Sequence, residues 1–189
     1  MHLLGLISAV TPHPKLQYLL WRNSQRCGIK CQLKYPSEPM ENAIAGILLA
    51  AGKSTRYGEQ KLLQPLPDSG IPVALQAANN LLQVLPLSVV VIRENDPSLN
   101  ELLAFTGIHI FENRFANQGI STSIKAGIQA IDDWLDNTDQ LKGYVIALAD
   151  MPFISPAVIR RVAQGVLENN LICAPHYQGQ RGTTPAHET

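Results

Sequence analysis

Apolar runs alternate with helix-like segments along the chain after residue 43. The first run, residues 44–49, contains no polar residue, which is typical of a strand covered on both faces in a parallel sheet. Residues 61–66 indicate a short extended piece. Four further strands are predicted at residues 87–92, 108–111, 144–149 and 171–174. Helical spacing of apolar residues predicts helices at residues 72–84, 99–105, 120–134 and 156–167, the last of them opened by Ser155.

Strands separated by helices predict the class of fold. The pattern favours an α/β fold with a Rossmann-like, doubly wound, mostly parallel sheet and helices on both faces. Ligands of such sheets bind beyond the carboxyl ends of the strands. The residues that follow each predicted strand are therefore the first candidates for a site.

The stretch after the first strand changes character abruptly. Ala50-Ala51-Gly52 is followed by small polar residues and by the cations Lys53, Arg56 and Lys61. Small residues let a backbone approach a ligand closely, and exposed amides can bind phosphate oxygens. Cations along the same loop can neutralise a triphosphate. This composition predicts a nucleotide site.

One interpretation of this loop is a P-loop. Gly52-Lys53-Ser54 looks like the end of a Walker A motif. That motif places its first glycine at position 47, where this chain has Ile47, and Gly46 lies one residue too early. A P-loop-type ATPase or kinase stays as an alternative, and it would make Lys53, not Lys61, the essential lysine.

A second interpretation fits the loop without gaps. Residues 49–61 closely resemble the signature loop of the molybdenum cofactor nucleotidyltransferases, and more narrowly that of their cytidylyltransferase branch. That branch carries Ala-Ala-Gly where the guanylyltransferases carry Ala-Gly-Gly. The resemblance covers about residues 43–182 and implies a fold of the glycosyltransferase-A-like kind. It implies that the nucleotide is bound by Leu49, Ala50, Ala51, Gly52, Ser54, Arg56, Gly58, Lys61, Ser121 and Ser123.

Asp150 follows the predicted strand at residues 144–149. A carboxylate at the carboxyl end of a buried strand points into the crevice, and Pro152 keeps Met151 extended. The resemblance implies that Asp150 binds Mg²⁺ and that Arg56, Lys61 and Asp150 are the catalytic residues. One carboxylate is chemically adequate, because Mg²⁺ takes one or two carboxylates together with phosphate oxygens and water. A Walker B aspartate would look similar.

Two polar clusters have simpler explanations. Hydroxyls at residues 121–123 are expected to cap the helix at residues 120–134, whose start also attracts anions. The family carries a similar element there, which implies contact with the nucleotide or the pterin. Capping alone is the alternative. A second cluster is interpreted as a solvated face, and it consists of Asp132, Asp133, Asp136 and Asp139.

The two ends of the chain differ from its body. Residues 1–40 hold five Lys or Arg and one Glu, a net charge of +4, and Pro12, Pro14 and Pro36 interrupt any long helix. We expect residues 1–39 to be an extension outside the fold, with a targeting arm as the alternative, and residues 40–189 to be the nucleotidyltransferase domain. Thr183 stands where the family has His, and the chain ends at Thr189. The domain is therefore predicted to be incomplete at its C-terminus, and a truncated, inactive nucleotide-binding domain is a further alternative.

The resemblance implies a nucleotidyltransferase that transfers CMP from CTP to a molybdopterin-type cofactor, with Mg²⁺ as its cofactor and release of pyrophosphate. A molybdoenzyme or its chaperone would be a further partner. Residues 41–189 carry a net charge of −4, which argues against general nucleic-acid binding. The apolar stretch at residues 3–10 is too short to span a bilayer, so no membrane partner is expected. Three cysteines give no disulfide framework, and a cytoplasmic protein is predicted.

Overall fold

A four-stranded parallel sheet forms the centre of the fold. The computed structural model of the 189-residue chain describes residues 44–52, 61–135, 141–168, 172–177 and 180–181. The sheet has the order β3-β2-β1-β4, and each neighbouring pair of strands is parallel. Its strands are β1 (Ile44–Leu49), β2 (Ser88–Arg93), β3 (His109–Asn113) and β4 (Gly143–Leu148). The predicted parallel sheet is confirmed.

Helices occupy the segments between the strands. The α-helices are α2 (Val73–Leu82), α3 (Pro97–Ala104), α4 (Ile120–Trp134) and α5 (Pro156–Leu167). Two 3₁₀-helices, η1 (Lys61–Leu63) and η2 (Ala116–Gln118), precede α2 and α4. The predicted helices are confirmed, and α4 and α5 have the predicted bounds. As expected, α5 is opened by Ser155, whose hydroxyl accepts a hydrogen bond from the backbone N–H of Val158.

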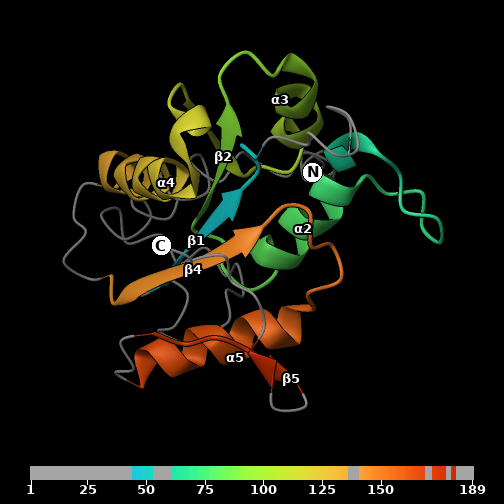
Figure 1. Cartoon of the computed structure of the whole chain (residues 1–189). Coiled ribbons are helices and arrows are strands. Elements are labelled where there is room, and N and C mark those ends of the chain that lie inside the picture. Colours follow the sequence, from blue (N-terminus) through green and yellow to red (C-terminus); the bar gives the residue numbers. More distant parts are fainter. Residues whose placement is uncertain (1–43, 53–60, 136–140, 169–171, 178–179, 182–189) are drawn as a thin grey trace, which may run out of the picture. The chain divides into compact units, whose positions relative to one another are not determined.

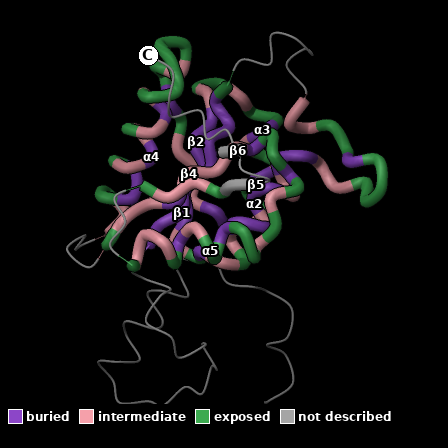
Figure 2. The backbone as a smooth tube through the Cα atoms, turned by 60° about the horizontal axis from the view of Figure 1, so that its bottom comes forward, coloured by how far each residue is buried: buried purple, intermediate pink, exposed green. Residues whose placement is uncertain are grey.

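The helices cover both faces of the sheet. Because side chains alternate along a strand, Ile44 and Leu48 of β1 pack in one apolar cluster with α2, α3 and α5. Ala45 and Ile47 pack in a second cluster with α4. Figure 1 shows β4, β1 and β2 side by side, and Figure 2 shows β1 and β2 coloured as buried. The sheet is therefore doubly wound, as the apolar run of β1 predicted.

The expected extended piece at residues 61–66 is wrong for its first half. Lys61–Leu63 forms η1, and Leu62 and Leu63 pack against the cluster that contains α2. Two neighbouring leucines can reach the same apolar surface from a helical turn, whereas in a strand they would point to opposite faces. Extended pairing is limited to an isolated antiparallel bridge between Pro65 and Pro72.

The fifth strand predicted at residues 171–174 is also wrong. Residues 172–175 are not part of a strand, and Leu171 lies outside the described residues. Instead, β5 (His176–Tyr177) and β6 (Gln180–Arg181) form a separate two-stranded antiparallel pair. Pro175 has no N–H to donate to a neighbouring strand, which disfavours extension of the sheet through this segment.

A close contact explains the glycine inside β1. Gly46 lies opposite Ser88, and a Cβ atom at position 46 would collide with the Ser88 hydroxyl oxygen. That hydroxyl is buried and donates a hydrogen bond of 2.6 Å to the Leu85 carbonyl oxygen. Gly46 therefore has a packing reason to be glycine, independent of any phosphate-binding motif.

The acidic cluster near the end of α4 is a solvated face in its described part. Asp132 and Asp133 are exposed. Asp133 accepts a hydrogen bond from Gln129 one turn earlier, and Asp132 accepts one of 3.3 Å from the Tyr144 hydroxyl. Burial, followed by the charge of Asp132, raises the pKa of Tyr144. Asp136 and Asp139 lie outside the described residues.

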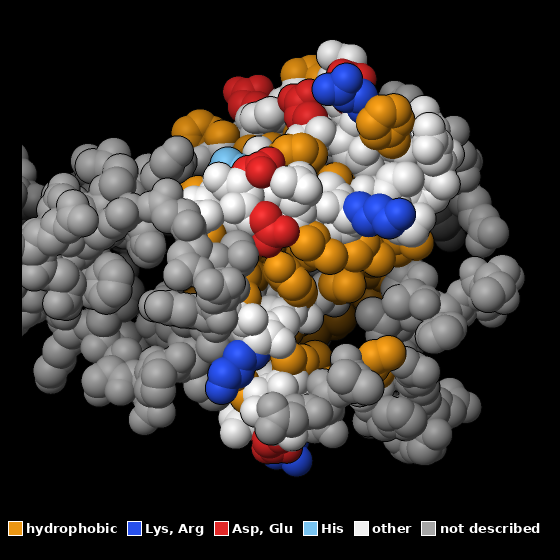
Figure 3. Space-filling model, turned by 90° about the vertical axis from the view of Figure 1, so that its left-hand side faces the viewer, with side chains coloured by type: hydrophobic (Ala, Val, Ile, Leu, Met, Phe, Trp, Pro, Cys, Tyr) orange, Lys and Arg blue, Asp and Glu red, His pale blue; other side chains and the backbone are white. Residues whose placement is uncertain are grey.

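Charged side chains are dispersed over the surface in the view of Figure 3, where Lys and Arg side chains are separated from one another. A contiguous basic patch would be the electrostatic sign of nucleic-acid binding, and this face does not carry one among the residues that the figure colours.

No helix within the described ranges has both the length and the apolar character needed to cross a membrane.

Gly127 allows α4 to pack closely on the sheet. A Cβ atom at this position would lie 2.5 Å from Cγ2 of Ile47 and 3.2 Å from Cγ2 of Val91. Both neighbours are fully buried β-branched residues of the two central strands. Such side chains have little freedom to rotate away, so an added methyl group would move the helix.

We predict that Gly127→Ala destabilises the protein, although the same change in an exposed helix would stabilise it by about 1 kcal/mol. Overpacking a core of this kind costs about 1–3 kcal/mol, which corresponds to roughly 3–10 °C in Tm. Thermal unfolding followed by circular dichroism measures the effect. Lys125→Ala on the exposed side of the same helix is the control. An unchanged or higher Tm in Gly127→Ala would contradict the close packing.

Candidate active site

The candidate site lies where the strands end. Because all four strands are parallel, the residues after β1, β2, β3 and β4 meet at one edge of the sheet. β1 has β2 on one side and β4 on the other. The chain reaches β2 from β1 through α2 on one face of the sheet, and it reaches β4 from β3 through α4 on the opposite face. The crevice between β1 and β4 is thus the switch point at which open α/β sheets bind ligands.

Backbone hydrogen bonds hold the loops after β1 and β4 beside each other. The Ala149 N–H donates to the Leu49 carbonyl oxygen at 3.0 Å. On the other side of β1, the Ala50 N–H donates to the Val91 carbonyl oxygen at 2.8 Å. The start of the signature loop is therefore fixed between two neighbouring strands, with Asp150 one residue beyond one of these bonds.

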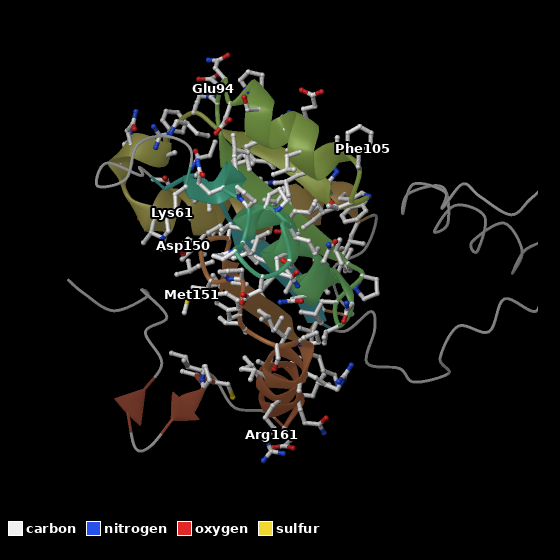
Figure 4. The ribbon with its side chains drawn as sticks, turned by 90° about the vertical axis from the view of Figure 1, so that its right-hand side faces the viewer. Lys61, Glu94, Phe105, Asp150, Met151 and Arg161 are labelled. Atoms are coloured by element: carbon white, nitrogen blue, oxygen red, sulfur yellow. The ribbon has the colours of Figure 1, made fainter. Side chains whose placement is uncertain are left out.

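An ion pair joins two of the residues predicted from sequence. Lys61 Nζ lies 3.2 Å from Asp150 Oδ2, although the residues are 89 positions apart in the chain. Figure 4 shows the two labelled side chains close together. Lys61 starts η1 at the end of the signature loop, and Asp150 follows β4. The side chains are 43% and 47% exposed, so solvent and ligands can reach both.

This exposure limits what the pair contributes to folding. Exposed ion pairs typically contribute about 0–1 kcal/mol, because water screens the charges and ordering the side chains costs entropy. A cation and a carboxylate are, however, the two groups needed to hold phosphate oxygens and a divalent metal ion. The pair therefore adds little to stability and leaves both charged groups accessible at the switch point.

The signature loop begins buried and becomes exposed. Leu49, Ala50 and Ala51 are at most 8% exposed, whereas Gly52 is exposed and a Cβ atom there would meet no atom of the described residues within 4 Å. The described part of the loop therefore leads from the buried end of β1 to the surface at Gly52. Ser54, Arg56 and Gly58, predicted to bind the nucleotide, lie outside the described residues, and their roles stay predictions.

Ala51 does not present its methyl group at an open surface. The residue is 2% exposed and belongs to the apolar cluster under α4. Its carbonyl oxygen accepts a hydrogen bond of 3.3 Å from Nη2 of Arg93, the last residue of β2. In this arrangement Ala51 can act on a ligand through the path of its backbone, and not through steric contact of its side chain.

The polar residues at the start of α4 form a network instead of a helix cap. The residue before the helix is Gly119, with φ of 118°, and no side chain caps the first turn. The expected capping is therefore wrong. The hydroxyl of Thr122 lies 2.9 Å from the Phe115 carbonyl oxygen and 2.8 Å from that of Gly119, and it donates its one hydrogen to these acceptors. Ser123 is 4% exposed and is bonded by the amide of Asn113, while Ser121 is exposed.

Three residues of this region were missed by sequence reasoning. Arg93 and Asn113 end β2 and β3, and each one holds a loop at the same edge of the sheet. Asn80 of α2 binds the turn after Asp150. Their positions at strand ends could have indicated Arg93 and Asn113, because residues there face the ligand side of such a sheet. Asn80 lies inside a helix and gave no comparable signal.

The described residues fit a metal ion that arrives with a nucleotide. Within the described ranges, no group of three or more His, Cys, Asp or Glu could hold a metal ion. The carboxylate of Asp150 is half-exposed at the open edge, with Lys61 as its ion-pair partner. One carboxylate is a weak site alone but is adequate for Mg²⁺ when phosphate oxygens and water complete the shell.

Solved structures with the same fold include a nucleotidyl transferase and a cytidylyltransferase. A nucleotidyl transferase from Methanothermobacter thermautotrophicus (Mth528) matches at a TM-score of 0.55 and 24% identity, over 65% of this chain and 57% of that chain. Rv0371c from Mycobacterium tuberculosis H37Rv matches at a TM-score of 0.54 and 22% identity, over 67% and 62%. A cytidylyltransferase from Leptospira borgpetersenii matches at 0.52 and 17%, over 68% and 50%.

At these identities the similarity shows the fold alone. This chain spans about three fifths of the length of the first two structures. The search among curated proteins found no match.

The family comparison covers the site as well as the fold. The MobA-like NTP transferase domain matches residues 46–187, which include most of the sheet, the signature loop, Lys61 and Asp150. A match over this much of the chain, together with the doubly wound sheet, decides the assignment: the chain belongs to the family of MobA-like NTP transferase domains.

Proposed function

We propose that this protein is a cytidylyltransferase that transfers CMP from CTP to a molybdopterin-type cofactor and releases pyrophosphate. The observation that carries the proposal is the ion pair between Lys61 and Asp150 at the switch point of the sheet. It places a cation that would bind phosphate beside a carboxylate that would bind a metal ion, at the edge of the sheet where the signature loop begins. Family membership and the Ala-Ala-Gly sequence support the choice of reaction and nucleotide.

The chemistry requires positioning and charge neutralisation more than acid–base catalysis. An oxygen of the terminal phosphate of the pterin attacks the α-phosphorus of CTP. A new phosphorus–oxygen bond forms while the bond to the β-phosphate breaks, and the electron pair leaves with pyrophosphate. Lys61 would hold triphosphate oxygens, and amides of the signature loop would seat the phosphate chain. Arg56 is proposed for the same task.

Asp150 would hold Mg²⁺ together with phosphate oxygens of the nucleotide. When bound, the ion would neutralise charge that develops on the triphosphate. Asp150, which is paired with Lys61 in the structure, would be the residue that holds the ion. The half-exposed ammonium group of Lys61 would be accessible to the phosphates.

Release of pyrophosphate is the direct test of the proposal. The assay is run with CTP, GTP and ATP, each with and without molybdopterin. Release from CTP that depends on molybdopterin supports the proposed function. Hydrolysis of ATP without molybdopterin would favour the P-loop alternative, and nucleotide binding without turnover would favour an inactive binding domain.

We predict that Lys61, and not Lys53, is the essential lysine. Removing a preorganised donor from developing charge costs about 3–4 kcal/mol, or on the order of 10²–10³ in rate. Lys61→Ala should therefore nearly abolish turnover, whereas Lys53→Ala should lower it only slightly. Steady-state kinetics of the two variants give the ranking, and the reverse order would restore the P-loop interpretation.

Asp150→Asn should separate metal binding from folding. The amide keeps the shape of the side chain but removes the charge that Mg²⁺ requires. Because the residue is half-exposed and its ion pair is worth little, Tm should change by no more than a few degrees. We expect turnover to collapse and CTP to bind with the same affinity with and without Mg²⁺, as measured by calorimetry. Normal dependence on Mg²⁺ would refute the metal assignment.

The wild-type chain should prefer CTP to GTP, and kcat/KM for the two nucleotides measures that preference. The shape of a pocket alone typically changes kcat/KM between two similar substrates by about 10–200-fold. Because the methyl group of Ala51 is buried, Ala51→Gly should make the loop more flexible and weaken the binding of CTP and GTP equally. A ratio that shifts toward GTP in this variant would show that the methyl group contacts the base. A wild type that prefers GTP would refute the cytidylyltransferase assignment.

A further inference from the structure

The turn that follows Asp150 is weakly held by its own backbone. It links β4 to α5 through residues 149–155. The Met151 N–H donates to the Leu148 carbonyl oxygen at 3.2 Å, and the Ile154 N–H donates to the Met151 carbonyl oxygen at 3.4 Å. Both distances are at the long end for N–H···O bonds. A turn with such bonds needs other contacts to fix the direction of the carboxylate that opens it.

Asn80 supplies two of these contacts from a different element. It lies in the last turn of α2, and its side-chain Nδ2 donates to the carbonyl oxygens of Pro152 at 2.9 Å and Ile154 at 3.0 Å. The two bonds use both hydrogens of the amide group. The same side chain thus holds the turn at two points, two and four residues after Asp150.

The acceptor atom of Asn80 is bonded as well. Its Oδ1 accepts a hydrogen bond of 2.8 Å from Nε2 of Gln76, one helical turn earlier. A bond from Gln76 to the oxygen turns the nitrogen of the Asn80 amide toward the two carbonyls. The orientation of the amide is therefore set from within α2.

A polar residue at this position is unusual for α2. The other buried residues of the helix are all apolar, and they are Val73, Ala74, Ala77, Ala78 and Leu81. Asn80 is 8% exposed, so its amide would cost stability if it were unpaired. An apolar residue would satisfy the packing of the helix but would leave the carbonyl oxygens of the turn without this donor.

We propose that Asn80, oriented by Gln76, is a positioning residue that fixes the turn after Asp150 and aims the Asp150 carboxylate at the metal of a bound nucleotide. This role rests on the proposed function, because it assumes that Mg²⁺ and CTP bind at Asp150. Asn80 does not touch the reacting atoms. It acts through the backbone of residues 152 and 154, and Figure 4 shows Asp150 and Met151 at the start of this turn.

The test compares CTP binding with and without Mg²⁺. Calorimetry gives the Kd of CTP in each condition, and the ratio of the two values measures the contribution of the metal without requiring turnover. Removing a residue that orients a metal ligand typically costs 10–100-fold in metal affinity. Asn80→Ala should therefore reduce the ratio by about 10-fold or more, while CTP binding without Mg²⁺ stays near that of the wild type.

Asn79→Ala is the matched control. It removes the same side chain from the same helix at a neighbouring position, where no hydrogen bond to the turn is found among the described residues. The control should keep the wild-type ratio. Gln76→Ala should reduce the ratio less than Asn80→Ala, because it leaves both donors in place but removes the bond that orients them.

A purely structural role for Asn80 would lower Tm without changing the ratio in the folded protein. That result would overturn the positioning role. If Asn80→Ala does not fold, Gln76→Ala provides the test instead. A wild-type ratio of the two Kd values in that variant would overturn the proposal. A wild-type chain that binds CTP with no contribution from Mg²⁺, or binds no nucleotide, would refute the proposed function first and this role with it.

Discussion

The parallel pairing of β1 with β4 is the constraint on which the candidate site depends. Its register runs from Ile44 opposite Gly143 to Leu49 opposite Leu148, and the Ala149 N–H continues it by one further bond to Leu49. Lys61 and Asp150 come from segments far apart in the sequence, and this pairing brings their loops to one edge. A slip of one residue would displace Asp150 by about 3.3 Å and turn the side chains of β4 to the opposite face.

At this edge of the sheet, the residues that stabilise the fold differ from those proposed for the chemistry. Leu49, Ala50 and Ala149 are buried immediately beneath it and belong to the two apolar clusters of the sheet. Lys61 and Asp150 stand above them, half-exposed. Since the charged pair contributes little to folding, its residues could bind phosphate and metal, as we propose, without loss of the fold. The buried residues of the site stabilise the fold, and its two charged side chains are the groups proposed to bind ligands.

Sequence reasoning succeeded where a pattern repeats over many residues. The unbroken apolar run of β1 and the helical spacing of α4 gave the correct element types, and the bounds of α4 agreed. It failed at Lys61–Leu63, because three residues carry too little periodicity to distinguish a helical turn from an extended piece. The segment at residues 172–174 has the composition of a strand but does not pair with the sheet.

Sequence reasoning could locate only those residues of the candidate site that belong to a motif or follow a strand. Lys61 and Asp150 were both predicted, and the structure adds that they contact each other. Asn80 could not be found in this way, because the partners of its amide lie 72 and 74 residues away. A hydrogen bond between distant segments leaves no local pattern. The sequence also did not indicate that Ala51 is buried, since an alanine in a loop gives no sign of which way its methyl group points.

The contact between Gly46 and Ser88 has a consequence for how this sequence can evolve. The hydroxyl of Ser88 occupies the space that a side chain at position 46 would need, and it also satisfies the Leu85 carbonyl oxygen. A larger residue at position 46 therefore requires the loss of the hydroxyl at position 88, and that loss leaves a buried carbonyl without its donor. Neither position can drift independently. In relatives that keep this register of β1 and β2, the two residues should covary as a pair, with a side chain at one position matched by a smaller one at the other.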